Sequence, residues 1–578
     1  MFFQHIIHKL RNWRNPRNFT IWYDSSYRLP ITSLGMQHGL EPRRSDFALW
    51  YLFDVAAIHL KQIHKPPKLC FKDIARVHSC EYLESLTQPK TLSELFAVEP
   101  WDIPVDELLH SIRLASGGTV AAAQHVLKNG GTALNLLGGF HHASPKRGGP
   151  LCPINDIAIA VAKLRDEGFE GQINIIDLDA HPPDGIADCL GGEAKIWIGS
   201  LSAADWGELK GVNETLLATD CDDKTYLKAL EKLLGEMPIP EISFVIAGGD
   251  VIAGDKMGGL ALSLEGAKQR DLRVFEALQG LPSVWIPGGG YQKESWKVLA
   301  ATGMILSQGS TRKIPDHYNP LRKHFRKIAN QLDDDDLEGE EFMTQGDIDE
   351  LFGLSPYKSY RMLDYYTANG IEYALYQYGI FDYMRRLGYH SFKISLDRNN
   401  NGHRLRVFGK SEGKKELLLE LVLEKQVIEK TPMLYIHWFN LRNPRSEFSE
   451  QKPQLPGQET PGLGLAKESS ELFYRIAKRL DLKGIAFRPA WYHIAYAMRY
   501  RFQFIDPIRQ ARFEGLQRDL GHIQLLKLTT AISEKKVKIN GEIYSWESEL
   551  MAFWVDLPFI DRKRIEEEKR KVSFSLFL

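Results

Sequence analysis

The chain has 578 residues, too many for one hydrophobic core, because single cores stop growing beyond roughly 250–300 residues, so we expect two domains. Its 73 lysines and arginines nearly balance 74 aspartates and glutamates, and the formal charge of −1 argues against direct nucleic-acid binding. The five cysteines lack CxxC spacing, which argues against a disulfide framework or a thiolate zinc site. The opening MFFQHIIHKLRNWR has no secretory h-region, and no later stretch of about 18 apolar residues occurs, so we expect a cytoplasmic protein without membrane contact.

Short apolar runs alternate with helical patterns in the first half of the chain. NDIAIAVAKLRDEG, TYLKALEKLLGEM and the segment from Ala267 to Leu278 have the spacing of helices. This repetition predicts an α/β domain of three layers, a parallel sheet with helices on both faces. The expected strands and the glycines that follow them are GTALNLLGG (131–139), INIIDLD (173–179), SFVIAGGD (243–250) and SVWIPGGG (283–290).

Polar side chains follow all four of these strands. In parallel α/β sheets ligands bind outside the carboxyl ends of the strands, so these residues are the candidates for chemistry. They are His141 and His142, which come with Phe140 after the first strand, Asp177, Asp179 and His181 after the apolar INII of the second, Asp250 after the third and Tyr291 after the fourth.

The spacing of Asp177, Asp179 and His181 places two carboxylates and an imidazole on one side of an extended chain. Such crowding is costly unless a cation neutralises it, and zinc with two oxygen ligands, one nitrogen and an open position is a catalytic arrangement. Asp179 and His181, with Asp250 from another strand end, are the predicted ligands. Taken alone, a DxDxH sequence is also compatible with helix capping or a hydrogen-bond network.

The motifs resemble those of the histone deacetylases, including bacterial acetyl-polyamine amidohydrolase relatives on the arginase-deacetylase fold. The resemblance covers about residues 20 to 310, and EPRRSDFALWYL and ARVHSCEYLESL are similar to the N-terminal helices of that family. The motifs follow in the family's order: GGFHHASP (138–145), CPINDIAIA (152–160), IDLDAH (176–181), GDVIAGDKMGGLALS (249–263) and PGGGY (287–291).

The resemblance implies a role for each site residue in the hydrolysis of an acetylated amine. Asp179, His181 and Asp250 would hold zinc, and a Ser-Leu pair similar to Ser200 and Leu201 would help bind potassium. The other implied roles are His142 as general base, His141 as its charged partner near the leaving amine, Asp177 and Asp184 as the carboxylates orienting His141 and His142, and Tyr291 as the donor to the oxyanion.

Three positions depart from the family pattern. Pro182 and Pro183 follow His181 where the family has a flexible polar pair, and Leu151 replaces a channel phenylalanine. Trp206 is a candidate for the opposite wall of that channel, and Met257 resembles a methionine at its floor. An acetylated protein and a small acetylated amine such as a polyamine both fit as the substrate.

An acidic run from Asp333 to Asp336, continued by Glu338, Glu340 and Glu341, predicts a linker. We therefore expect a deacetylase domain over residues 1–330, an acidic linker over 331–341 and a second domain over 342–578. The alternative is a solvated loop inside one larger domain.

The second half combines strands and helices. FKISLD, HRLRVFGK, ELLLELVLE and MLYIHWFNL predict an antiparallel meander, and a glycine turn with Gly462 and Gly464 then precedes an amphipathic helix, the strand GIAFRPA and the helix WYHIAYAMRY. This α+β order resembles acetyl-coenzyme-A-dependent N-acetyltransferases, in which such a turn binds pyrophosphate at a helix N-terminus. Glu459 stands where that family prefers Gln or Arg.

Three interpretations of the second domain stay open: a working acyltransferase, a silent accessory domain of similar fold, or an unrelated structure. If the first domain has lost turnover, it would be a zinc- and acyl-amine-binding module that regulates a C-terminal acyltransferase. The final DRKRIEEEKRK pairs opposite charges at helical spacing, which favours a solvated helix.

Overall fold

A computed structural model describes residues 18–32, 39–278, 280–310, 312–338, 360–449, 453–555 and 561–577. The chain divides between Pro320 and Leu321 into two compact units, each with a buried core. The opening segment used to assess a secretory signal lies outside the described residues. Among the helices that are described, none combines the length and the apolar character needed to cross a bilayer.

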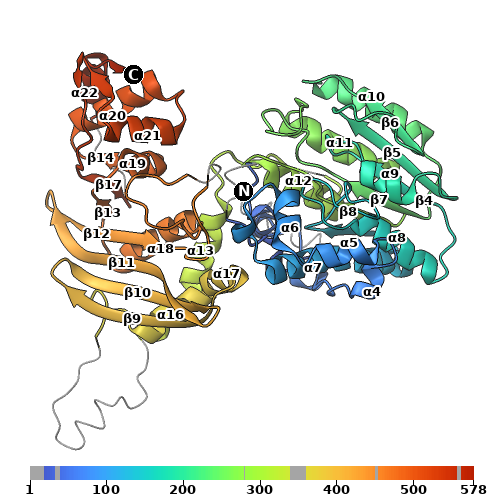
Figure 1. Ribbon diagram of the computed structural model, residues 1–578, viewed down its shortest axis with the longest axis horizontal. Helices are drawn as coiled ribbons and strands as arrows, with labels where there is room; N and C mark the ends of the chain where they lie inside the picture. Colours follow the sequence, from blue (N-terminus) through green and yellow to red (C-terminus); the bar gives the residue numbers. More distant parts are fainter. Residues whose placement is uncertain are drawn as a thin grey trace, which may run out of the picture. The chain divides into compact units, whose positions relative to one another are not determined.

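The first unit is built on an eight-stranded sheet in the order β2-β1-β3-β8-β7-β4-β5-β6, and every neighbouring pair is parallel (Figure 1). The four strands expected from the sequence, β3, β4, β7 and β8, lie together at its centre. The strands are β1 (Phe19–Trp22), β2 (Ile63–His64), β3 (Thr132–Asn135), β4 (Ile173–Asp177), β5 (Ile196–Ser202), β6 (Val212–Leu216), β7 (Ile242–Ile246) and β8 (Ser283–Ile286).

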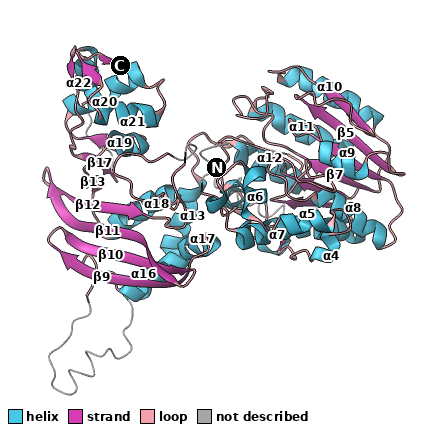
Figure 2. Cartoon of the chain, in the orientation of Figure 1, coloured by secondary structure: helices cyan, strands magenta, loops and turns pink. Residues whose placement is uncertain are grey.

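Helices cover both faces of this sheet, which confirms the three-layer α/β architecture predicted from the alternating pattern (Figure 2). The two central strands β4 and β7 are buried at every position, as burial on both faces requires. The helices are α3 (Arg44–Asp54), α4 (Phe71–Ile74), α5 (Cys80–Ser85), α6 (Pro89–Phe96), α7 (Val105–Asn129), α8 (Asp156–Asp166), α9 (Asp184–Leu190), α10 (Asp223–Glu236), α11 (Leu264–Ala277) and α12 (Ser295–Gln308), with short 3-10 turns at Ser25–Tyr27, Leu60–Gln62 and Pro100–Asp102.

The acidic segment differs from the expected linker. Residues Asp334–Glu338 form helix α14, which follows α13 (Pro320–Gln331), and Leu337 of α14 is buried in the core of the second unit. Ion pairs with Arg479 and Arg361 offset two of its carboxylates, so the run of charges does not prevent folding. Residues 339–341 of the expected linker lie outside the described residues.

The second unit contains a seven-stranded mixed sheet in the order β14-β17-β13-β12-β11-β10-β9 and a three-stranded sheet in the order β16-β15-β18. The meander predicted from the sequence is β9 to β12, antiparallel throughout. The strands are β9 (His390–Asn399), β10 (Gly402–Ser411), β11 (Lys414–Ile428), β12 (Thr431–Leu441), β13 (Gly484–Phe487), β14 (Gln503–Phe504), β15 (Val537–Ile539), β16 (Glu542–Ile543), β17 (Met551–Trp554) and β18 (Phe574–Leu576).

The chain leaves β12, forms the amphipathic helix α18 and returns as β13, which pairs with β12 in parallel. The remaining helices of this unit include α22, formed by the charged C-terminal segment as predicted. They are α16 (Ala368–Gln377), α17 (Ile380–Arg386), α18 (Ala466–Arg479), α19 (Tyr492–Met498), α20 (Pro507–Leu520), α21 (Leu525–Ser533) and α22 (Arg562–Arg570).

Candidate metal centre

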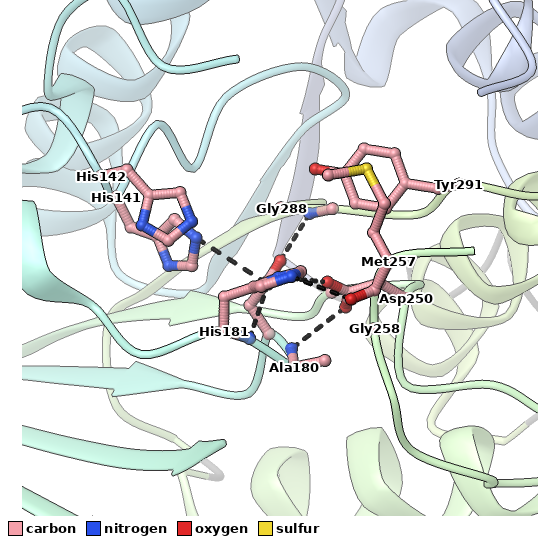
Figure 3. A network of polar contacts seen from close by, with 12 residues as sticks. His141, His142, Ala180, His181, Asp250, Met257, Gly258, Gly288 and Tyr291 are labelled. Carbon is pink, nitrogen blue, oxygen red and sulfur yellow. Dashed lines mark hydrogen bonds and ion pairs between the residues drawn. The ribbon is translucent and has the colours of Figure 1, made fainter. Parts of the chain in front are cut away.

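The carboxyl ends of β3, β4, β7 and β8 bring the predicted site residues to one edge of the parallel sheet (Figure 3). Because β4 is paired with β7, Asp177 at the end of β4 lies beside Ile246 at the end of β7. Asp179, two residues after Asp177, and Asp250, four residues after Ile246, then approach each other. The buried Arg270 donates to the carbonyls of Leu178 and Gly248, at 3.2 and 2.6 Å, and so ties the two segments together.

Asp179, His181 and Asp250 converge on one point. One ligand atom from each lies within 4.8 Å of the others. Nδ1 of His181 is 3.0 Å from Oδ1 of Asp179 and 3.1 Å from Oδ2 of Asp250. On its far side, Nε2 of His181 is 3.1 Å from the carbonyl of Met257. With a cation bound between the carboxylates, a proton on Nε2 would donate to that carbonyl and Nδ1 would offer its lone pair to the cation.

The electrostatics of this cluster favour a cation. Both carboxylates are buried, and burial together with the charge of Asp179 raises the pKa of Asp250 to about 7. Burial opposes protonation of His181, but the neighbouring Asp179 and Asp250 outweigh it and raise its pKa to about 11. Two carboxylates and an imidazole in a buried site form a donor set for a divalent metal such as zinc, and the set also suits other divalent ions.

Two histidines next to this cluster are each paired with a carboxylate. Nδ1 of His141 is 2.8 Å from Asp177, and Nδ1 of His142 is 2.6 Å from Asp184. The two rings differ in charge state. Burial opposes the charged form of His141, but Asp177 and Asp179 raise its pKa to about 9. Burial and the neighbouring His141 lower the pKa of His142 to about 4, so His142 is neutral near pH 7.

Tyr291 lies on the other side of the cluster, with its ring centre 6.5 Å from that of His181 (Figure 3). Burial and the charges of Asp179 and Asp250 raise the pKa of its hydroxyl well above the usual value, so the hydroxyl remains a hydrogen-bond donor. The amide of Tyr291 donates to Asp255 at 2.6 Å. The glycines before it admit the ligand carboxylates, because a Cβ on Gly289 would lie 2.6 Å from Oδ2 of Asp250.

Three residues that support the site were not predicted from the sequence. Arg44 donates to the carbonyls of Gly288 and Gly289, at 2.6 and 2.9 Å. Asp156, fully buried, accepts the amides of Gly139 and Phe140 just before the two histidines. His78 joins the carbonyl of Ser144 to the amide of Asn155. Each contacts residues at least 16 positions away, and the only signal in the sequence was that each lies in a segment similar to the family: EPRRSDFALWYL, CPINDIAIA or ARVHSCEYLESL.

Trp206, the candidate channel wall, and two of the residues that depart from the family pattern, Leu151 and Pro183, lie near the two histidines. Trp206 is 45% exposed, and its ring centre lies 5.0 Å from that of His142 and 6.2 Å from that of His181. Leu151 has a φ of +58° and, with Arg44 and Tyr291, lines a cavity of about 60 Å³ that adjoins His141 and His142. Pro183 precedes helix α9, whose first residue, Asp184, contacts His142.

Ser200 lies in β5 directly opposite Asp177 of β4. Its hydroxyl is buried and has no hydrogen-bond partner in the part of the chain that the structure describes. Leu201, the next residue, is also fully buried. A buried hydroxyl without a partner is costly, so this position has room for an additional polar interaction.

Gly462 and Gly464 lie in the connection from β12 to helix α18 in the second unit. Gly464 has a φ of +74°, a conformation that favours glycine. Leu463 and Leu465, on either side of it, are buried. Glu459 pairs with Arg442 at 2.8 Å. The glycines therefore shape the turn, and their predicted role in binding a cofactor remains a prediction.

The first unit is similar in sequence to known deacetylases. A family model described as the histone deacetylase domain matches residues 38–304. Histone deacetylase 2 of Arabidopsis thaliana is 29% identical over 316 residues, 51% of this chain and 81% of the relative. Histone deacetylase 8 of Xenopus tropicalis is 26% identical over 309 residues, 48% of this chain and 81% of the relative. An uncharacterized protein of Picosynechococcus is 29% identical over 280 residues, 46% of this chain and 87% of the relative.

Two solved structures are also similar. An HDAC homolog from Aquifex aeolicus is 23% identical with a TM-score of 0.44, covering 53% of this chain and 87% of that chain. An HDAC homolog complexed with SAHA is 24% identical with a TM-score of 0.42, covering 49% of this chain and 82% of that chain.

Proposed function

Because residues 38–304 belong to the histone deacetylase family, we propose that the first unit is a zinc-dependent deacetylase that hydrolyses an N-acetyl amine. The observation that carries the proposal is the convergence of Asp179, His181 and Asp250 within 4.8 Å, next to two histidines that are each paired with a carboxylate. When bound there, zinc would supply a Lewis acid that polarises the acetyl carbonyl and makes a water molecule acidic near neutral pH.

The chain's own groups complete the proton transfers. Neutral His142, with Nδ1 engaged by Asp184, takes a proton from the attacking water at Nε2. Charged His141 lies beside it, with ring centres 4.0 Å apart, and stabilises the negative charge that develops nearby. The Tyr291 hydroxyl donates to the carbonyl oxygen as charge builds on it. The departing amine leaves with a proton returned from the histidine pair, so the products are acetate and the free amine.

A potassium ion near the catalytic metal would use the Asp177–Asp179 region and the Ser200–Leu201 pair. The support for this part of the proposal is the Ser200 hydroxyl, which is buried without a partner next to the end of β4. A bound cation would satisfy that hydroxyl and would offset the carboxylates of the site. Comparing acetate release in potassium and in caesium salts tests it.

The substrate is an acetylated lysine in a protein or a small acetylated amine such as a polyamine. The aromatic Trp206 beside His142 provides an apolar wall for the methylene chain that both have in common. Parallel assays on acetyl-lysine peptides and on acetylated polyamines separate them, because the ratio of kcat/KM values reports which amine the site prefers.

The test is acetate release by the zinc-loaded protein with His142→Ala and Tyr291→Phe as variants. Loss of the base should lower kcat by roughly 10²–10⁴-fold, and loss of the oxyanion donor by roughly 10²–10³-fold. Zinc content, measured by mass spectrometry, should stay at one ion per chain in both. No release by wild-type protein with full zinc would instead favour a module that binds zinc and acyl amines and regulates the second unit.

As a second candidate function, we propose that the second unit is an acyltransferase-like domain that binds acetyl-coenzyme A. The observation that favours it is the order β12, Gly462–Gly464 turn, α18, β13, with β13 parallel to β12. Titration calorimetry of the whole protein with coenzyme A, repeated with Gly464→Val, tests the proposal. If the wild type does not bind coenzyme A, the second unit does not use this cofactor and the proposal fails.

A further inference from the structure

The second unit contains a cavity of about 110 Å³ between its sheet and the helices that cover it. We propose that this cavity is a binding site for a small carboxylic acid with an apolar chain. Neither the metal ligands nor the glycines of the Gly462–Gly464 turn line this cavity. The proposal therefore stands independently of the deacetylase and acyltransferase assignments.

The walls of the cavity are apolar on both sides. Leu405, Leu421 and Phe439 project from β10, β11 and β12, and Leu375, Leu472 and Ile476 face them from α16 and α18. Apolar walls exclude strongly hydrated ligands and favour a hydrocarbon chain. An engineered cavity of roughly 150 Å³ with similar walls binds benzene. The smaller volume here therefore suits an apolar chain of about four or five carbon atoms.

The polar groups that line the cavity are all donors. The polar residues among the lining, each able to donate a hydrogen bond, are Arg475, Arg479, Tyr366, Tyr378 and Ser469, and no Asp or Glu is among the described lining residues. Two guanidinium groups repel an amine, whereas a carboxylate accepts from them in a planar, charge-assisted arrangement. The chemistry of the lining thus selects an anionic head group.

Arg475 has hydrogen-bonding capacity to spare. It is 8% exposed, its Nη2 donates to the carbonyl of Arg322 at 3.1 Å, and its buried Nε has no partner among the described residues. The same Nη2 also donates to Glu471 at 3.5 Å, but this one carboxylate is shared by three guanidinium groups, those of Arg475, Arg322 and Arg501. By contrast, Arg479 donates to the carbonyls of Ala329 and Leu332, each at 2.8 Å. Arg475 is therefore the residue that a bound carboxylate would pair with.

Sodium hexanoate is the probe, with hexylamine and hexan-1-ol as matched ligands that change only the head group. In titration calorimetry, the whole protein should bind hexanoate, should bind hexanol at least 10-fold more weakly and should show no binding of hexylamine. The result should be the same with and without zinc, because a carboxylate bound at the metal centre would be lost from the metal-free protein. Equal binding of hexanoate and hexanol, or zinc-dependent binding alone, would overturn the proposal.

Two variants locate the site. Arg475→Gln should weaken hexanoate binding at least 10-fold, since it removes a charge-assisted hydrogen bond, whereas Arg385→Gln on the exposed side of α17 should leave it unchanged. Ala374→Phe should fill the cavity and abolish binding while circular dichroism shows that the fold is retained. Unaltered binding in both Arg475→Gln and Ala374→Phe would mean that hexanoate binds elsewhere, and the proposal would fail.

Discussion

The imidazole of His78 shows how one buried ring can organise the loops of a site without contact with the reacting atoms. Its Nδ1 lies 3.0 Å from the carbonyl of Ser144, two residues after His142, and its Nε2 accepts the amide of Asn155 at 2.9 Å. Only a neutral ring protonated at Nδ1 satisfies both partners. Burial, at 2% exposure, lowers the pKa of His78 to about 4 and keeps the ring in this state.

This depressed pKa makes the stability of the first unit depend on pH. In the unfolded chain the ring has a pKa near 6.5, so between pH 6.5 and about 4 the unfolded state binds a proton that the folded state does not. Stability therefore falls as the pH falls through this window, by up to about 3 kcal/mol for a difference of roughly 2.5 pH units. His78→Gln removes this dependence.

Urea unfolding of wild type and His78→Gln across that pH window measures the effect. The variant should be less stable near neutral pH, because its amide fits the two partners less well, and the gap should narrow towards pH 4. A gap that stays constant or widens on acidification would contradict the assignment of a neutral His78.

Gly289 shows how the absence of a side chain makes room for a metal. A Cβ at this position would lie 2.6 Å from Oδ2 of Asp250 and 2.9 Å from Oδ2 of Asp179. Gly289→Ala should therefore displace the carboxylates and weaken zinc binding by roughly 10–100-fold, the range typical of lost support around a metal site. Competition with a chelator measures the zinc affinity, and Gly235→Ala, whose Cβ meets nothing within 4 Å, is the control.

At the scale of elements, the strands of the first unit that form long apolar runs were predictable and the others were not. Strands β3, β4, β7 and β8 belong to apolar runs in which glycine or aspartate follows within three residues or ends the strand, so their pattern was clear in the sequence. In contrast, β6 is largely half-exposed, and its consecutive polar residues Asn213 and Glu214 interrupt the alternation of apolar and polar side chains that indicates a strand. Part of the predicted linker, Asp334–Glu338, forms helix α14, because this acidic segment contains one apolar residue, Leu337, that it can bury.

The contacts of the site were only partly predictable for a related reason. The pairing of His142 with Asp184 was expected from the resemblance to the histone deacetylases, and the two side chains lie 2.6 Å apart. The contacts of Arg44 with Gly288 and Gly289 span more than 240 positions and have no local signature. Propensity and periodicity carry no information about such long-range partners.

Helix α9 places Asp184 against His142, and its second residue has no room for a side chain. A Cβ on Gly185 would lie 2.3 Å from the carbonyl carbon of His142 and 2.6 Å from the amide nitrogen of Ala143. Gly185→Ala should push helix α9 and the histidine loop apart. A displacement of about 1 Å can cost 10²-fold in rate, so kcat should fall by about this factor.

Acetate release by Gly185→Ala and by Gly235→Ala, both glycine-to-alanine changes in helices of the same unit, separates this effect from general destabilisation. Gly235→Ala should keep full activity and gain up to about 1 kcal/mol of stability, because alanine is the better helix former. Full activity in Gly185→Ala would show that the position of Asp184 does not limit the reaction.

At the scale of the whole molecule, each unit has its own core and its own candidate site. The metal ligands belong to residues 179–250, and the apolar cavity belongs to residues 329–479. The sequence predicted a division into two parts because of its length and its change of pattern, while the compact units meet earlier, at Pro320 and Leu321. We therefore expect two unfolding transitions in calorimetry, each sensitive to its own ligand.

Zinc should raise one of these transitions and leave the other in place. A ligand present at 100 times its dissociation constant stabilises the folded state by about 2.7 kcal/mol, which corresponds to several degrees for a unit of this size. Leu421→Ala, which creates a cavity in the second unit's core, should lower only the transition that zinc leaves unchanged. In Asp179→Ala neither transition should respond to zinc. If zinc instead shifted both wild-type transitions together, the two units would unfold as one cooperative body, and the independence of their sites would have to be abandoned.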